Sequence, residues 1–320
     1  MMLAVSEDLQ WSRQLREANR RKKNGAPFKY AEALFVSLAI TRSMMQIPYR
    51  QLAGMASEMM SDIPMPSHAT IHRRIRNLRV QAIGSMVTVT AADGSKGIFY
   101  AVDSTGIKVD NLGEWIRKKW KARRGFVKMH ILVDTDTGMI RALRVTDESV
   151  GDSKMFAQLL EEGMPDGGTG CLKTDCVPKE QEKEEQHQRI SVLADGAYAS
   201  RDIHKTCADC GATPLIRLKV SSTARGKGKG DAWGLAVRDQ LGGSPTSPVG
   251  TLTKEQKAEN QKKWKKRVRY GRRWTVEIVI SAFKRIFGES VMATRWEDMV
   301  HEMTLKVATY NRITAIGGWN

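Results

Sequence analysis

The chain has 320 residues, with 52 Lys and Arg against 35 Asp and Glu, which gives a formal net charge of +17. Hydrophobic residues make up 41% and charged residues 27%, a globular composition that excludes wholesale disorder. The longest apolar run, residues 33–40, is far shorter than the roughly 20 residues of a membrane span. The start has no basic segment before an apolar stretch, so we expect no secretory signal and a cytoplasmic protein without a membrane partner.

The charge excess favours a polyanionic partner, and nucleic acid is the commonest one. A generally basic surface is the alternative, and charge alone does not separate the two. The four cysteines are too few to indicate a disulfide scaffold in a chain of this length.

The N-terminal part is predicted to be helical. Residues 1–24 are polar and end in four basic residues, which indicates a basic arm. Residues 25–92 have apolar positions at helical spacing, interrupted by prolines, and are predicted to form an all-helical domain. Its last helix, at residues 71–78, is typical of a helix-turn-helix DNA-binding domain, although an ordinary amphipathic surface helix has the same pattern. The cations on this helix are the candidate DNA-binding residues Arg73, Arg74 and Arg76.

From residue 98 the pattern changes to short apolar strands, followed by strands that alternate with helices. This order predicts a mixed α/β sheet flanked by helices over residues 95–218. Asp136-Thr137-Gly138 is typical of a hairpin turn between the second and third strands. The expected strands are 98–103, 126–134, 139–145, 190–195 and 214–218, and the expected helices are 153–162 and 200–209.

Residues 219–262 interrupt the sheet pattern. They are polar and basic with little apolar material, so we expect an insertion or mobile loop before the last helices. Between residues 254 and 273 there are ten Lys and Arg and two acidic residues, which fits either a solvated helix or a phosphate-contacting surface. Residues 263–320 are predicted to hold two helices, the first from Val276 and the second over 296–311.

Two acidic residues stand at the ends of apolar strands. Asp103 ends the first expected strand and Asp195 ends the fourth. A carboxylate is costly to bury there unless it is paired or bound to a metal, and ligand chemistry in α/β sheets gathers at strand ends. A turn or a helix cap explains either aspartate taken singly, but two such residues on neighbouring strands weaken that explanation.

Glu277 supplies a third carboxylate. At 100° per residue, Arg273 lies about 40° away and Lys284 about 20° away on the same helix, beside the apolar stripe that begins at Val276. Tyr270 joins them only if the helix extends past Gly271, which is doubtful. The alternative is an exposed face with ordinary salt bridges. Three carboxylates suit Mg²⁺ or Mn²⁺, and two such ions about 3.5–4 Å apart can activate a nucleophile at a phosphodiester.

These residues resemble a known family. Tyr270-x2-Arg273-x3-Glu277-x6-Lys284 is similar to the "YREK" signature of insertion-sequence DDE transposases. The segments 102–106, 128–134, 194–198 and 283–288 resemble the sequence blocks of the insertion-sequence family four and five superfamily. The resemblance covers about residues 95–218 and 263–315.

The resemblance implies a ribonuclease-H-like catalytic domain in which Asp103, Asp195 and Glu277 hold two divalent ions. It implies that Tyr270, Arg273 and Lys284 contact DNA near the cleaved phosphate. The implied activity is cut-and-paste transposition at the nucleoid, on terminal inverted repeats and target DNA, by a homodimer in the synaptic complex. The alternatives are a metal nuclease without strand transfer and a DNA-binding regulator derived from a transposase.

All four cysteines fall between residues 171 and 210. The spacing of Cys171 and Cys176, and of Cys207 and Cys210, is compatible with a structural zinc site. We favour ordinary packing, because Cys207 and Cys210 fall near the end of a predicted helix.

Overall fold

A computed structural model describes residues 13–20, 26–60, 64–78, 97–110, 125–164, 190–223, 231–242 and 252–318. The chain divides into two compact units. The first comprises residues 1–88, 109–112 and 285–313, and the second comprises residues 89–108, 113–284 and 314–320. None of the helices within the described ranges is long and apolar enough to cross a membrane.

The first unit is mainly helical where it is described, and it also contains the two-residue strand β6 (Ser290–Val291). It contains α2 (Glu32–Met45), α3 (Tyr49–Met59), α4 (His68–Arg76) and most of α12 (Trp296–Gly317). Ser67 caps α4 by accepting a hydrogen bond from the Thr70 amide. The three N-terminal helices and α12 share one apolar core, so the predicted N-terminal helices are confirmed but pack with the C-terminal helix. The buried residues of this core are Leu34, Phe35, Leu38, Ala39, Leu52, Ala56, Ile71, Ile75, Leu78, Leu305 and Ala308.

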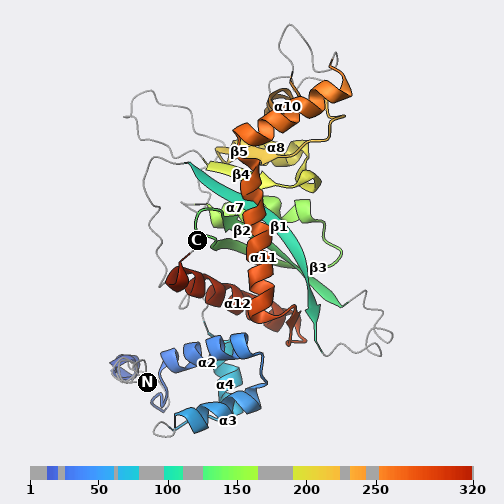
Figure 1. Ribbon diagram of the computed structural model, residues 1–320. Coiled ribbons are helices and arrows are strands. Elements are labelled where there is room, and N and C mark those ends of the chain that lie inside the picture. Colours follow the sequence, from blue (N-terminus) through green and yellow to red (C-terminus); the bar gives the residue numbers. More distant parts are fainter. Residues whose placement is uncertain are drawn as a thin grey trace, which may run out of the picture. The chain divides into compact units, whose positions relative to one another are not determined.

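The second unit is built on a mixed sheet with strand order β3-β2-β1-β4-β5 (Figure 1). β1 pairs antiparallel with β2 and parallel with β4, and β5 continues the parallel part. All five predicted strands are present; β2 has the predicted bounds, and the other four differ at one or both ends. Their bounds are β1 (Ile98–Val109), β2 (Phe126–Asp134), β3 (Ile140–Asp147), β4 (Ile190–Ala194) and β5 (Ala212–Ile216).

The turn between β2 and β3 forms as the sequence predicts. Gly138 has a φ of 66°, a backbone conformation that glycine adopts without strain, and its amide donates to the Asp134 carbonyl. The Asp134 carboxylate accepts hydrogen bonds from the backbone amides of Asp136 and Thr137. Asp134 therefore ends its strand as a turn-forming residue.

One face of the sheet is covered by α7 (Phe156–Gly163), which follows the short helix η1 (Asp152–Met155), and by α8 (Arg201–Asp209). Tyr100 and Val102 of β1 point into this core, where Phe156 and Tyr198 also pack. Because side chains alternate along a strand, Asp103 is directed to the opposite face. Figure 1 shows α11 (Trp274–Phe287) crossing the strands.

Residues 219–262 were expected to be an insertion or a mobile loop with little core, and the mobile-loop alternative is wrong for two described parts, whereas the insertion stays a prediction. Residues Ala232–Leu241 form α9, and residues Lys254–Arg267 form α10, which extends beyond that range. Val237 and Leu241 of α9 are fully buried against Leu218. The sequence does not reveal this core, because the core contains few apolar residues and one of them, Leu218, comes from the preceding segment.

Two buried glutamines fasten these helices to the backbone beyond β5. Gln240 of α9 accepts from the Leu218 amide at 3.0 Å and donates to the Ile216 carbonyl at 2.7 Å. Gln261 of α10 donates to the Leu218 carbonyl at 2.7 Å. Backbone polar groups that the sheet leaves unpaired are thus satisfied by side-chain amides.

The core beneath α9 generates a stability prediction. Leu241→Ala removes a fully buried side chain and should lower the free energy of unfolding by about 2–5 kcal/mol. Leu235→Ala on the same helix, where the side chain is 56% exposed, should change it by less than about 0.5 kcal/mol. Urea unfolding followed by circular dichroism measures both, and equal effects would show that α9 is not packed as described.

Candidate active site

The sheet brings Asp103 and Asp195 to the same level on neighbouring strands. Ala101 of β1 pairs with Leu193 of β4 in a parallel register, and two residues further along each strand stand the two aspartates. Because the side-chain period of a strand is two residues, both carboxylates are directed to one face. The predicted adjacency of the two strands is confirmed, whereas the prediction that Asp103 ends its strand is wrong, because β1 continues to Val109.

Each aspartate is also fixed locally by the backbone. Asp103 Oδ1 accepts from the Ser104 amide at 2.8 Å. Asp195 Oδ1 accepts from the Ala197 amide at 2.7 Å and caps the short helix η3 (Gly196–Tyr198). The capping role that we weighed against a functional one is real for Asp195, and it orients the carboxylate rather than removing it from the site.

Glu277 lies in the first turn of α11, where the helix dipole favours an acidic side chain. Val276, Val279, Phe283 and Phe287 are buried along one side of this helix, as the apolar period predicts. Glu277 itself is exposed and forms an ion pair with Arg273, four residues earlier. The Arg273–Glu277 pair expected from the helical stripe is thus present.

The pKa of Asp103 depends on all three acids. Burial is the main cause that raises the pKa of Asp103, and the carboxylates of Asp195 and Glu277 raise it further. The Ser104 amide and the guanidinium of Arg273 act in the opposite direction. Three carboxylates and one guanidinium therefore form a single interacting group around a half-buried aspartate.

Tyr270 lies in the short connection between α10 and α11 and is not part of either α-helix. α10 ends at Arg267, and residues Tyr270–Arg273 form the short helix η5 before α11, so the doubt raised by Gly271 is confirmed. The Tyr270 hydroxyl donates to the Ala194 carbonyl at 2.8 Å, next to Asp195. Burial raises the pKa of Tyr270, so its hydroxyl stays a neutral donor. This bond fastens the connection between α10 and α11 to the end of β4.

Lys284 lies two turns further along α11, about 10 Å from Glu277 along the helix axis. Its side chain is half-buried. Within the described ranges, neither a hydrogen bond nor an ion pair joins it to the three acids, so the structure leaves it apart from them.

The three candidate arginines of the N-terminal unit are in different surroundings. Arg74 stacks over the rings of Phe28 and Phe35, and Arg76 forms a 2.7 Å ion pair with Asp298. Arg73 is exposed. Two of the three cations are thus engaged within the protein.

Only half of the candidate zinc ligands lie within the described residues. Cys207 is a residue of α8 and is fully buried in the core. Burial raises the pKa of its thiol to about 12. Cys210 is half-buried, and Cys171 and Cys176 lie outside the described residues. The four-cysteine site stays a prediction.

One residue that the sequence did not single out completes the frame of the site. Arg272 forms a 2.9 Å ion pair with Asp136 in the β2–β3 turn and stacks over the ring of Phe99. These partners are more than 130 residues distant in the chain, and no local spacing signals the contact. Arg272 and Tyr270 hold the start of α11 against the sheet from two sides.

Among the residues that the structure describes, no three His, Cys, Asp or Glu side chains are gathered closely enough to hold a metal ion. The Glu277 carboxylate is paired with Arg273 instead. The two acids that act on Asp103 electrostatically, Asp195 and Glu277, nevertheless also carry carboxylate oxygens. Hard divalent cations prefer such oxygens as ligands.

A mixed sheet with two aspartates on adjacent strands and a glutamate on a crossing helix agrees with the DDE class of enzyme that the sequence resembles. A family model described as "Transposase DDE domain" matches residues 94–312, and a second with the same description matches residues 1–112. The chain therefore belongs to the transposase DDE domain family, whose members carry out DNA transposition by cleaving and transferring DNA strands and generally use divalent metal ions.

Among solved structures, the chain aligns with the cryo-EM structure of the piggyBac transposase synaptic complex with hairpin DNA. Its sequence identity to this chain is 9% and the TM-score is 0.41, over 96% of this chain and 71% of that chain. The prediction of a transposase is confirmed by the family match, whereas the insertion-sequence group and the YREK signature stay predictions.

The electrostatics of Asp103 predict the effect of removing its charge. Because its pKa is raised, the ionised form destabilises the fold near neutral pH, and this loss disappears when the carboxyl is protonated. Asp103→Asn should therefore raise the midpoint of thermal unfolding in EDTA at pH 7, and the gain should shrink as the pH falls through the pKa of Asp103.

Asp147→Asn is the matched control. Hydrogen bonds from Ser149 lower the pKa of Asp147, so its charged form stabilises the fold above its ordinary pKa. This variant should lower the midpoint at pH 7. A shift of both variants in the same direction would contradict the electrostatic environment assigned to Asp103.

Proposed function

We propose that the chain excises and inserts an insertion sequence by cut-and-paste transposition, with Asp103, Asp195 and Glu277 as the catalytic carboxylates. The observation that supports this most directly is the electrostatic group centred on Asp103, in which both other acids act on one half-buried carboxyl. A single acid of this kind has many structural explanations. Three acids from β1, the end of β4 and α11 require a fold that brings together residues 174 positions apart.

The donor set fits Mg²⁺ or Mn²⁺, because both prefer carboxylate oxygens. Such ions would be held by Asp103, Asp195 and Glu277, and when bound they would supply an activated nucleophile and stabilise charge on the leaving oxygen. Asp103 and Asp195 are oriented for this role by the Ser104 and Ala197 amides. Glu277 joins them by turning its carboxylate away from Arg273.

The reaction follows in two phosphoryl transfers. Water attacks a phosphodiester at the element end, and the bond to the 3′ oxygen breaks to leave a free 3′-hydroxyl. That hydroxyl then attacks a phosphodiester of the target, forming one bond and breaking another. In the DNA complex Arg273, released from Glu277, neutralises phosphate charge close to the carboxylates, and Tyr270 holds the end of β4 in place.

The N-terminal unit is proposed to bind the terminal inverted repeats, with α4 as the candidate recognition helix and Arg73, which has no ion-pair partner among the described residues, as a contact to DNA. A homodimer in the synaptic complex would hold both element ends. Lys284 is proposed to contact DNA further along α11, where its half-buried stem keeps it close to the helix.

Single alanine substitutions of Asp103, Asp195 and Glu277 should each abolish cleavage of a labelled element end in Mg²⁺. The affinity for the same DNA should remain within a few-fold of the wild type, since no substituted residue supplies positive charge. Glu161→Ala, which removes an exposed acid of α7, is the control and should cleave normally. Near wild-type cleavage by any one of the three variants would remove that residue from the site.

A joining assay separates transposition from its alternatives. Given a pre-cleaved end with a free 3′-hydroxyl and a supercoiled plasmid, the wild-type protein should produce covalently joined products. A nuclease on the same fold would cleave the uncut end without joining it, and a DNA-binding regulator would do neither.

A further inference from the structure

Residues 262–273 contain eight Lys and Arg and no acidic residue. Arg267 and Arg272 form ion pairs with acids from elsewhere in the fold, and Arg273 pairs with Glu277 four residues later. The other five form no ion pair with any acid in the described part of the chain, and a sixth cation, Arg217, follows β5. We call these six the cationic surface: Arg217, Lys262, Lys263, Lys265, Lys266 and Arg269.

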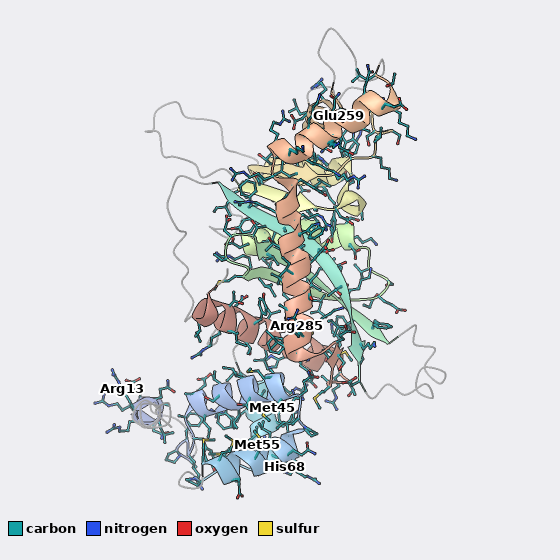
Figure 2. All side chains as sticks on the ribbon, in the orientation of Figure 1. Arg13, Met45, Met55, His68, Glu259 and Arg285 are labelled. Atoms are coloured by element: carbon teal, nitrogen blue, oxygen red, sulfur yellow. The ribbon has the colours of Figure 1, made fainter. Side chains whose placement is uncertain are left out.

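The helix that carries most of these charges is firmly held. A capping box between Thr253 and Gln256 begins α10. Trp264 is 2% exposed, and Asn260 donates to the Leu241 carbonyl at 3.0 Å, in addition to the bond from Gln261. Figure 2 shows the side chains of α10, the helix labelled at Glu259, standing out from the ribbon. A purely solvated helix would not need this anchoring.

Arg269 is held in a costly backbone conformation. Its φ of 53° and ψ of 42° are left-handed, and it stands just after α10 where helices commonly end with glycine. A residue with a Cβ is disfavoured there, because the side chain crowds the backbone. The Arg269 side chain is exposed, so packing does not explain the choice of residue. A strained residue that packing does not require is a candidate for a functional role.

The cationic surface adjoins the carboxylates. Arg269 directly precedes Tyr270, whose hydroxyl binds the Ala194 carbonyl beside Asp195. Lys265 Nζ lies 6.0 Å from the centre of the Tyr270 ring. Burial lowers the pKa of Lys265 and the nearby charge of Arg217 lowers it further, which is the crowding that a bound anion relieves. Arg269 also borders a surface hollow of about 250 Å³ over β1, β4 and β5.

We propose that the cationic surface binds the phosphate backbone of duplex DNA flanking the cleaved phosphate, with Arg269 at its centre. This rests on the proposed function and assigns it a DNA-binding surface outside the signature residues. The six helical residues from Lys262 to Arg267 extend about 9 Å, a length over which duplex DNA carries roughly five phosphate charges. Charge complementarity, a rigid support and adjacency to the carboxylates all favour this occupant over a neutral one.

Arg269→Gly separates a role in binding from a role in folding. Glycine accepts the left-handed conformation, so the variant should unfold at the same or a higher temperature than the wild type. Its affinity for an element-end duplex should fall several-fold, and the slope of log K against log salt should decrease by about 0.9 for the lost phosphate contact. Arg269→Lys should restore most of the slope. Fluorescence anisotropy in EDTA measures both quantities without cleavage.

The double variant Lys262→Gln and Lys266→Gln removes two proposed phosphate contacts. It should therefore decrease the slope of log K against log salt by about 1.8. Arg267→Gln, whose charge is already neutralised by Asp239, and Lys205→Gln on α8 are the controls and should change it much less. An unchanged slope for both Arg269→Gly and the double variant would overturn the proposal. These experiments measure binding alone, so their failure is distinct from a failure of the carboxylate substitutions to stop cleavage.

Discussion

The burial of Asp103 beside two other carboxylates is the constraint on which this structure depends. Burial is the main cause that disfavours ionisation of Asp103, and the carboxylates of Asp195 and Glu277 add to the cost. The fold accepts this because amides of Ser104 and Ala197 hold the aspartates and Arg273 holds the glutamate. An arrangement that is unfavourable in the free protein becomes favourable when positive charge arrives, which is the property expected of a site that works on DNA with divalent ions.

The segment between α10 and α11 connects the site to its surroundings. It carries Arg269, Tyr270, Arg272 and Arg273 within five residues, and each has a different task. Tyr270 and Arg272 are fastened to the sheet, Arg273 is paired with Glu277, and Arg269 is exposed. A short turn allows these neighbouring side chains to diverge, whereas a continuous helix would have stacked Tyr270 and Arg273 on one stripe.

Much of this was accessible from the sequence, and the limits have physical causes. Alternation of apolar residues located the strands, and an acid after an apolar run located Asp103 and Asp195, because both signals are local, although β1 extends six residues past Asp103. The contact of Arg272 with Asp136 and the hydroxyl bond of Tyr270 depend on the tertiary fold and leave no trace in local spacing. The core of α9 was missed because a handful of apolar residues, completed by Leu218, is enough to bury a short helix. Asp134 shows that a strand-end acid can also be purely structural. It ends β2, but its carboxylate binds turn amides and Arg141.

The glutamines of α9 and α10 have a consequence for the behaviour of the protein in solution. β5 is the last strand in the order of the sheet, and a terminal strand with free amides and carbonyls is a template on which a second molecule can polymerise. Gln240 and Gln261 occupy the carbonyl of Ile216, the last residue of β5, and the amide and carbonyl of Leu218 two residues further on. Two carboxamide side chains thus bind backbone groups that a further strand could otherwise pair with. This arrangement disfavours aggregation by strand pairing at that point of the chain.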